Sequence, residues 1–483
     1  MWNFGVLSFI FLISQVVTGV LLSMYYAPHE AFAFVSVESV IMRDVSFGWL
    51  LRYMHSNGAS FFFICVYIHL FRSLYYFSYV KPRLVVWNIG VIILLLMIIT
   101  AFTGYVLPWG QMSYWAATVI TNLFSAIPIF GEYIVLWLWG SFSVSSITLN
   151  RFFTFHFVFP FLLLFFVFLH FVFLHKVGSS NNLLINKKVD KIMFHPFYSF
   201  KDLIVIFVVL IIFFVFIWFA PNYLSHPDNY VMADSLSTPA HIVPEWYFSV
   251  FYAMLRSIPS KLGGILVLLL SILILFIFPF FIKIFFNQNL WNAEKIVYAP
   301  TRALFRVFWK ASFFKMSRKA YSYRRRRAYY ILYRTISLFK INFLFFVLVF
   351  VVLSFIGMKP IEYPYLEIGR IFTYFYFFYF FNLVFSFYVK YLVYFCQNSI
   401  YGLICLQKFV VVWIFMYPIL WWFIDVLLRE ALRVIFVYIP DILIWIYYFL
   451  EPYLKPYLKP FFMWIVRMAT KKKKVLPNKK VNV

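Results

Sequence analysis

Residues 52–70, RYMHSNGASFFFICVYIHL, and residues 151–173, RFFTFHFVFPFLLLFFVFLHFVF, decide the fold of this chain. Each is an apolar segment that carries two histidines fourteen residues apart. The histidines are His55 and His69 in the first segment, and His156 and His170 in the second. In an α-helix, fourteen residues advance about 21 Å and return to within about 40° of the same face. Each segment therefore places two imidazoles in line along a helix that could cross a membrane core of about 30 Å.

Two such helices that face each other would pair His55 with His156 and His69 with His170. Paired imidazoles at two depths of a bilayer are suited to hold two haem irons and to move electrons across it. A lone histidine in an apolar helix is more often a packed residue, but ionisable residues inside a membrane are costly and indicate function. Glycines repeat the same interval, and a missing Cβ lets a backbone approach a flat macrocycle or another helix closely. These glycines are Gly5 and Gly19 in the first apolar segment, and Gly90 and Gly104 in the third.

The composition is that of a polytopic membrane protein. Of the 483 residues, 65% are hydrophobic, and the mean hydropathy is +0.89, far outside the range of soluble domains. We therefore expect an all-α transmembrane helical bundle. Its eight core helices are expected at residues 4–24, 59–80, 85–107, 152–174, 203–220, 263–285, 341–357 and 366–389. Two further apolar runs, 409–428 and 434–449, are weaker candidates because acids and a proline interrupt them.

Cysteine is scarce, which limits the kind of redox centre the chain can hold. Its three cysteines are Cys65, Cys396 and Cys405, and no Cys-x-x-Cys-His motif is present. Any haem would therefore be held non-covalently, as a b-type haem. An iron–sulfur cluster on this chain is excluded because four thiolates are not available.

The net charge of +26 is distributed as in a membrane protein. Loops after the even-numbered spans are basic, above all in residues 283–340, whereas loops after the odd-numbered spans carry acids such as Glu38 and Asp228. This positive-inside pattern puts the N-terminus on the matrix or cytoplasmic side. Polybasic stretches such as 471–480 favour anionic lipid as a partner, and nucleic-acid binding is not expected.

Arginines lie beside the histidines at the expected helix ends. They are Arg52, Arg72 and Arg151. Haem propionates need cationic partners, and a guanidinium is a permanently charged fork. A snorkelling surface arginine is the alternative interpretation of each. The orientation puts His55 and His156 toward the outer face.

Long, ordered motifs between Trp2 and Phe285 resemble the cytochrome b family, the quinone-reactive, two-haem subunit of ubiquinol–cytochrome c reductase (complex III). Besides the two histidine segments they are WNIGVI (87–92), GYVLPWGQMSYWAATVITNLFSAIP (104–128), DKIMFHPFYSFKD (190–202), PEWYF (244–248) and LRSIPSKLGG (255–264). The resemblance implies the same pairing of histidines, with the low-potential haem on the outer pair and the high-potential haem on the inner pair.

At the outer face, the resemblance implies that Glu245 binds quinol and exports a proton. Quinol oxidation releases two protons, so its site needs a proton acceptor beside an apolar pocket. Without the resemblance, Glu245 would be interpreted as an acid at a helix N-terminus. The other residues that match this pocket are Pro244, Tyr105, Tyr252, Phe102, Ile120 and Phe248.

At the inner face, a quinone that is being reduced takes up protons, and ionisable side chains can relay them. His175, Lys201 and Asp202 lie near the inward ends of the fourth and fifth spans. The resemblance adds Asn3 and Ser179 to this quinone-reduction site. A solvated loop charge is the alternative interpretation of Lys201.

The resemblance further implies the mitochondrial inner membrane, with the N-terminus on the matrix side, and a dimeric complex III. Its expected partners are a Rieske iron–sulfur protein and a membrane-anchored c-type cytochrome. We expect a haem-binding bundle at 1–220, a quinol-site region at 221–390 with a basic insertion at 286–340, and a lineage-specific aromatic and basic extension at 391–483.

Two alternative interpretations fit the sequence less well. A chloroplast-type relative is split after four spans and has a fifteen-residue spacing in the fourth, so the fused chain and the fourteen-residue spacing argue against it. A transporter or channel would show internal repeats and broken helices around a midplane site, and neither is visible.

One departure from the family concerns Ala116, where the family usually has glycine beside the outer quinol pocket.

Overall fold

The computed structural model describes residues 2–180, 192–285 and 340–395. Within these residues every regular element is a helix, and the only strand-type pairing is an isolated bridge between Gly110 and Met232. The prediction of an all-α fold is confirmed.

The chain divides into two compact units, with the boundary after Gly402. The second unit, which contains the predicted runs 409–428 and 434–449, lies outside the described residues, as does nearly all of the 286–340 insertion. All of the helices below belong to the first unit.

Seven helices of the described residues are long and apolar enough to cross a membrane. They are α1 (Phe4–Ser23), α3 (Gly48–Tyr75), α4 (Leu84–Val106), α7 (Ser146–Val177), α8 (Phe197–Phe219), α10 (Lys261–Phe285) and the helix Lys340–Gly357. The eighth predicted span falls in α13 (Tyr365–Phe395), which is helical but is not among the seven. Its first turns carry Glu367 and Arg370, and its many tyrosine hydroxyls lower its hydropathy.

Helix α3 begins at Gly48, well before the start that hydropathy predicts at residue 59. The preceding Phe47 adopts a left-handed conformation with φ 58°, which ends the previous segment. Polar residues in the first turns of α3, such as Arg52 and Asn57, hide these turns from a hydropathy window. The earlier start puts His55 inside the helix and not in a loop before it.

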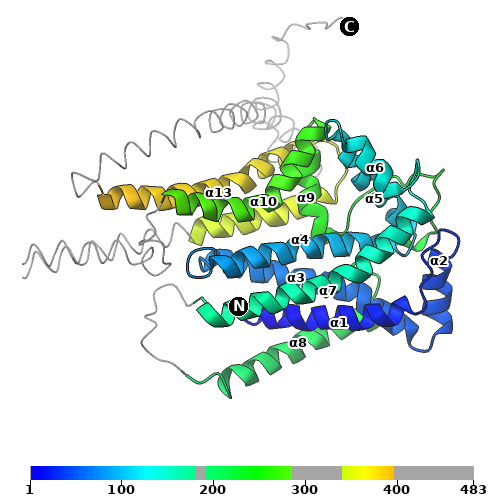
Figure 1. Ribbon diagram of the computed structural model, residues 1–483, viewed down its shortest axis with the longest axis horizontal. Coiled ribbons are helices and arrows are strands. Elements are labelled where there is room, and N and C mark those ends of the chain that lie inside the picture. The colour runs from blue at the N-terminus through cyan, green and yellow to red at the C-terminus, as the bar shows by residue number, and fades with distance from the viewer. Residues whose placement is uncertain (1, 181–191, 286–339, 396–483) are drawn as a thin grey trace, which may run out of the picture. The chain divides into compact units, whose positions relative to one another are not determined.

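The helices form two closely packed pairs, α1 with α3 and α4 with α7. Figure 1 shows these four helices lying side by side with their axes roughly aligned. Helix α8 packs on α3, while α10 packs on α4 and is joined by α9 (Trp246–Arg256) and α13. The two histidine helices, α3 and α7, thus belong to different pairs and face each other across the bundle.

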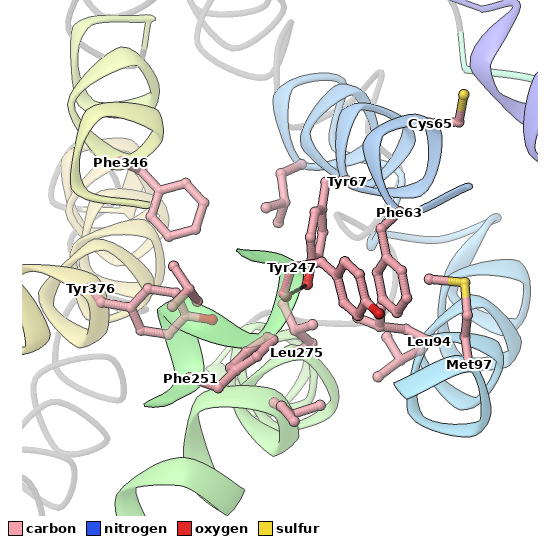
Figure 2. Close-up of a cluster of buried hydrophobic side chains, with 14 of the residues drawn as sticks. Phe63, Cys65, Tyr67, Leu94, Met97, Tyr247, Phe251, Leu275, Phe346 and Tyr376 are labelled. Atoms are coloured by element: carbon pink, nitrogen blue, oxygen red, sulfur yellow. Dashed lines mark hydrogen bonds between the residues drawn. The ribbon is translucent and has the colours of Figure 1, made fainter. Parts of the chain in front are cut away.

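An aromatic cluster connects α3 to the C-terminal helices (Figure 2). Phe63 stacks on Tyr247 with ring centroids 4.2 Å apart, and the Tyr67 hydroxyl donates to the Tyr247 carbonyl at 2.5 Å. Farther along, Phe346 stacks on Tyr379 at 4.1 Å. Helix association in lipid depends on such close packing because the hydrocarbon surroundings remove most of the hydrophobic driving force. The cluster fixes the start of α9, which follows Glu245 directly.

Short elements cover one end of the bundle, which we call the Glu245 end. They are α2 (Ala33–Val35), the π-helix η1 (Ser36–Asp44), α5 (Gln111–Asn122), η2 (Leu123–Ala126), α6 (Gly131–Trp139) and η3 (Pro227–Tyr230). The side chain of Asn229 accepts hydrogen bonds from the backbone N–H and the hydroxyl of Ser113, both at 2.9 Å. This contact holds the loop that leads to Glu245 against α5. The opposite end of the bundle, where α8 begins, is called the Asp202 end.

The LRSIPSKLGG motif has a structural role through Arg256. Its guanidinium donates to the Lys359 carbonyl at 2.5 Å and also to the Ile356 carbonyl, at the end of the helix Lys340–Gly357. Carbonyls in the last turn of a helix have no partner within it, so Arg256 caps this helix. This contact connects α9 to residues 359–369, KPIEYPYLEIG, which follow that helix.

Candidate functional site

At the Glu245 end, the structure brings His55 of α3 opposite His156 of α7, with ring centroids 6.0 Å apart. A glycine of a neighbouring helix faces each ring. A Cβ on Gly19 would lie 3.0 Å from Cε1 of His55, and one on Gly104 would lie 2.9 Å from Nε2 of His156. A Cβ on Gly104 would force a shift of the ring, and one on Gly19 would make an unusually tight contact, so the glycines leave the space that the imidazoles occupy.

The second pair repeats this arrangement toward the Asp202 end. His69 and His170 lie with ring centroids 6.4 Å apart. A Cβ on Gly5 would lie 3.2 Å from Cε1 of His69, and one on Gly90 would lie 3.3 Å from Cε1 of His170. The fourteen-residue intervals of the histidines and of the glycines therefore belong to one repeated contact between neighbouring helices.

Hydrogen bonds at Nδ1 orient the first pair of imidazoles. Nδ1 of His156 lies 2.8 Å from the Thr100 carbonyl, and Nδ1 of His55 lies 2.9 Å from the Thr18 hydroxyl. A carbonyl only accepts, and the Thr18 hydroxyl already donates to the Ser14 carbonyl at 2.7 Å. Each Nδ1 must therefore carry the proton, which leaves the Nε2 lone pair free for a metal.

The second pair has a related but less complete set of partners. The Val86 backbone faces His170, and Val86 precedes Gly90 by four residues, as Thr100 precedes Gly104. Nδ1 of His69 and Nδ1 of His170 are each buried without a hydrogen-bond partner among the described residues.

The three predicted arginines differ in their surroundings. Arg52 lines the cavity between His55 and His156. Arg72 is only 9% exposed, and its Nε has no partner in the described part of the chain, although its Nη1 donates to the Ser180 hydroxyl at 3.3 Å. Arg151 donates to the Trp137 carbonyl and lies 5.4 Å from the centroid of that ring. Two of the arginines can therefore receive an anion near the histidines, whereas Arg151 is directed toward α6.

A b-type haem fits these residues. Each histidine pair offers two imidazoles from facing helices, and the glycines leave room that any Cβ would fill. The buried, unpartnered Nε of Arg72 is a donor that a propionate could satisfy.

One cavity, with a volume of about 230 Å³, joins the first histidine pair to Glu245. Its wall includes His55, His156 and Arg52, together with Glu245 and Tyr105. The Glu245 carboxyl and the facing imidazoles of His55 and His156 thus share one continuous space at the Glu245 end.

The carboxyl of Glu245 has a raised pKa. Burial raises it from 4.5 to about 7, although the Tyr105 hydroxyl and the Arg52 guanidinium, which lie close to it, both act to lower it. A carboxyl with a pKa near 7 can take up and release a proton at physiological pH.

The other residues predicted for the outer pocket are not in the wall of this cavity. The Tyr252 hydroxyl donates to the Ile242 carbonyl at 3.4 Å, three residues before Glu245. Phe248 lies edge-on to Phe63 at 5.7 Å. Phe102, Ile120 and Pro244 are partly buried. Of the predicted set, the structure therefore brings only Tyr105 and Glu245 into the cavity wall.

At the Asp202 end, the Asn3 amide donates to the Asp202 carboxylate at 2.6 Å, which joins α1 to α8. Lys201 lies over the Tyr198 ring at 5.0 Å, and His175 is exposed in the last turn of α7. The Ser179 carbonyl accepts from Arg83 at 2.8 Å. The structure thus brings Asn3 and Asp202 together and leaves the other predicted residues of this site on separate contacts.

Several residues of the site were missed by sequence reasoning. Thr18 and Thr100 orient imidazoles, yet any helix presents threonines and carbonyls, so the sequence contains no signal for them. Arg83 and Trp2, which donate to carbonyls of the segment after α7 at 2.8–2.9 Å and 3.1 Å, could have been suspected only as polar residues next to apolar spans.

Comparisons with known proteins agree with this geometry. Residues 1–178 match the family model described as cytochrome b/b6/petB, and residues 232–315 and 321–377 match that described as cytochrome b (C-terminal)/b6/petD. The chain is 50% identical over 384 residues to cytochrome b of Acanthamoeba castellanii. The aligned residues make up 79% of this chain and 88% of the relative. The chain is 48% identical over 379 residues to cytochrome b of Rickettsia prowazekii, covering 78% and 84% respectively.

A solved structure is also similar. A chain of a "Hyperthermophilic respiratory Complex III" superposes with a TM-score of 0.67 and 31% identity, covering 81% of this chain and 92% of that one.

Proposed function

Because the chain belongs to the cytochrome b family, we propose that it oxidises ubiquinol at its Glu245 end and reduces ubiquinone at its Asp202 end. Two b haems would lie between these two sites. It is a core subunit of respiratory complex III, a quinol–cytochrome c reductase. The roles of its individual residues in this activity are what we propose.

The paired histidines would hold the haems, which supply one-electron carriers at two depths of the membrane. His55 and His156 would hold the haem near the Glu245 end, and His69 and His170 would hold the other. Thr18 and Thr100 keep the proton on Nδ1 of the first pair. Arg52 and Arg72 receive propionates. Arg151 is retained as a third candidate, although its guanidinium is directed toward Trp137.

At the Glu245 end, quinol would enter beside the cavity that contains Glu245 and Tyr105. The Glu245 carboxylate accepts a proton from the quinol hydroxyl, and its raised pKa lets it release that proton again near neutral pH. Pro244, Phe102, Ile120, Phe248 and Tyr252 are proposed to shape the apolar part of the pocket. Of these, Tyr252 positions the loop before Glu245 through its bond to Ile242.

At the Asp202 end, Asp202 is proposed as the residue that delivers protons to the quinone. The hydrogen bond from Asn3 orients its carboxylate. Lys201, His175 and Ser179 are proposed to complete the site as proton carriers and binding groups, because His175 and Ser179 lie at the end of α7 and Lys201 lies in the first turns of α8.

We also propose the location and partners. The basic loops at the Asp202 end and the acidic loops at the Glu245 end support a mitochondrial inner-membrane protein with its N-terminus on the matrix side. A Rieske iron–sulfur protein would take one electron from each quinol, and a membrane-anchored c-type cytochrome would receive it. Because the related solved structure is of a respiratory complex III, we propose a dimeric assembly with further complex III subunits.

The observation that carries the proposal is the repeated histidine–glycine contact at two depths of one bundle. The direct test is a potentiometric titration of the purified complex, followed by the difference spectrum of b-type haem. Two reducible b components are expected. A single component, or none, would reject the proposed pair of haem sites.

A further inference from the structure

Residues 178–180, which we call the post-α7 segment, directly follow α7 at the Asp202 end. The Arg83 side chain holds this segment. Its Nε donates to the Gly178 carbonyl at 2.9 Å, and its Nη2 donates to the Ser179 carbonyl at 2.8 Å. Hydrogen bonds from an ionised donor are roughly twice as strong as neutral ones, and a guanidinium presents its donors in one rigid fork. Because Arg83 is only 5% exposed, little water competes for these bonds.

Two further side chains reach Ser180, the last residue of the post-α7 segment. The indole of Trp2 donates to its carbonyl at 3.1 Å, and Nη1 of Arg72 donates to its hydroxyl at 3.3 Å. Trp2 precedes α1, Arg72 lies in α3, and Arg83 is the residue before α4. The post-α7 segment therefore joins the end of α7 to the three other helices of the two packed pairs.

The backbone of the segment has a conformation that favours glycine. Gly178 has φ 73° and ψ 163°, a combination that is essentially restricted to glycine. A Cβ at this position would meet no atom within 4 Å. The glycine is therefore required by the backbone conformation and not by a lack of space, and this conformation belongs to the turn whose two carbonyls face Arg83.

The Arg83 contact lies near the face of α4 that accommodates His170. Arg83 and Gly90 are seven residues apart, about two helical turns, and so lie within about 20° of one face. A Cβ on Gly90 would lie only 3.3 Å from Cε1 of His170, so α4 and α7 are closely packed there. A slide of α7 along α4 would change this contact, and the two hydrogen bonds of Arg83 oppose such a slide.

We propose that Arg83 is a positioning residue of the Asp202 end, which holds the post-α7 segment against α4 and thereby fixes the places of His170 and Ser179. The inference rests on the proposed function, because it takes His170 as a ligand of the inner haem and Ser179 as part of the quinone-reduction site. Arg83 acts through these two residues and not on the quinone itself.

The first test compares the purified complex with Arg83→Met, Arg83→Lys and Lys176→Met. Methionine keeps a long side chain but offers no donor. Lys176 is the matched control, because it is an exposed cation in the last turn of the same helix. The measurements are the midpoint potentials of the two b components and the hydrogen–deuterium exchange of backbone amides 174–180. We expect Arg83→Met to lower the potential of the inner component alone and to speed this exchange about tenfold or more. Arg83→Lys should recover the slow exchange only in part, because one ammonium cannot replace the fork that bridges two carbonyls.

The second test measures the quinone reaction at the Asp202 end by itself. Ascorbate first reduces the iron–sulfur protein and the c-type cytochrome, so that the Glu245 end has no electron acceptor. Added quinol can then reduce the b haems only from the Asp202 end. We expect this reduction to be about tenfold slower in Arg83→Met, since a misplacement of about 1 Å can cost as much as about 100-fold in rate. Lys176→Met should reduce at the parental rate.

The outcomes separate this inference from the proposed function. A parent complex without an inner b component, or without quinol reduction from the Asp202 end, rejects the proposed function. When the parent shows both, parental values in Arg83→Met overturn only the role of Arg83. A lowered potential with unchanged amide exchange also overturns it, because the loss of one charge would then account for the effect.

A second variant covers the case in which Arg83→Met loses the inner haem. Gly178→Ala removes no contact and keeps the Arg83 charge, but it strains the backbone that Arg83 holds. A shifted inner potential and faster exchange of amides 174–180, beside a parental outer component, support the proposal. Parental potential and exchange in Gly178→Ala overturn it.

Discussion

The backbone carbonyl of Thr100 accepts a hydrogen bond from Nδ1 of His156 at 2.8 Å, so helix α4 sets the tautomer of an imidazole on helix α7. The Val86 backbone faces His170 in the corresponding position, fourteen residues earlier. Each of these α4 residues precedes a glycine by four positions, and that glycine leaves room for the same ring. One face of α4 therefore leaves room for both imidazoles of α7, and its Thr100 carbonyl orients that of His156.

Removal of one inner imidazole should eliminate one haem and leave the other. We expect His69→Ala or His170→Ala to abolish the inner b component, because an apolar helix face offers no other iron ligand there. The outer component should persist, since His55 and His156 have their own partners. The measurement is the redox difference spectrum of the purified complex, with His29→Ala at an exposed histidine as the control. Retention of both components in either variant would show that the pairing is wrong.

The Thr18 hydroxyl should affect the midpoint potential and the content of the outer haem. Thr18→Val removes the acceptor for Nδ1 of His55 while keeping the shape of the side chain. Loss of such a partner of a metal-bound histidine typically weakens metal binding or activity by about 10–100-fold. We expect a shifted midpoint potential and a reduced content of the outer haem alone, and near-parental values for Thr18→Ser, which keeps the hydroxyl. Equal potentials in Thr18→Val and the parent would mean that this bond does not orient His55.

The fold and parts of the site could be predicted because they depend on patterns that hydropathy and spacing report. Apolar runs locate the membrane-crossing helices, and the interval from His156 to His170 locates the two depths at which the histidine pairs lie. The start of α3 could not be predicted, since Arg52 and Asn57 make its first turns polar although Asn57 is buried and Arg52 is partly buried in the bundle. The direction of Arg151 depends on Trp137 of α6, a contact for which the sequence has no pattern.

Glycine at position 104 should be required for the outer haem. In Gly104→Ala the new methyl would meet the His156 ring at less than contact distance, and such overpacking typically costs about 1–3 kcal/mol. We expect a lower content of the outer haem at normal levels of the inner one. Gly369→Ala is a matched control, because its Cβ would meet only Ile356 at 3.4 Å. The comparison is haem content per complex; equal outer-haem content in the two variants would argue against a role for the Gly104 space.

The raised pKa of Glu245 predicts how its contribution depends on pH. Below its pKa of about 7 the carboxyl is already protonated and cannot accept a proton, and above it the carboxylate is available. The ratio of parental to Glu245→Gln turnover should therefore rise as pH increases through about 7, because glutamine never accepts. Taking the ratio removes pH effects common to both forms. Haem content should be unchanged, and Glu132→Gln should give a ratio that stays flat. A flat ratio for Glu245→Gln as well would exclude it from proton transfer.

Ala116 of α5 stands where the family usually has glycine, as the resemblance of the GYVLPWGQMSYWAATVITNLFSAIP segment implies. Its side chain is only 4% exposed and is not in the wall of the cavity that contains Glu245, so a molecule bound against this backbone would compete for space that is already filled. Inhibitors of the methoxyacrylate type pack against that glycine in the family. An extra methyl in a filled space typically costs about 1–3 kcal/mol, equivalent to roughly tenfold or more in affinity. We therefore expect natural resistance with near-normal turnover, because quinol is smaller, and restored sensitivity in Ala116→Gly. Inhibitor titration of the two forms in membranes makes the comparison, and equal inhibition constants would mean that Ala116 does not border the pocket.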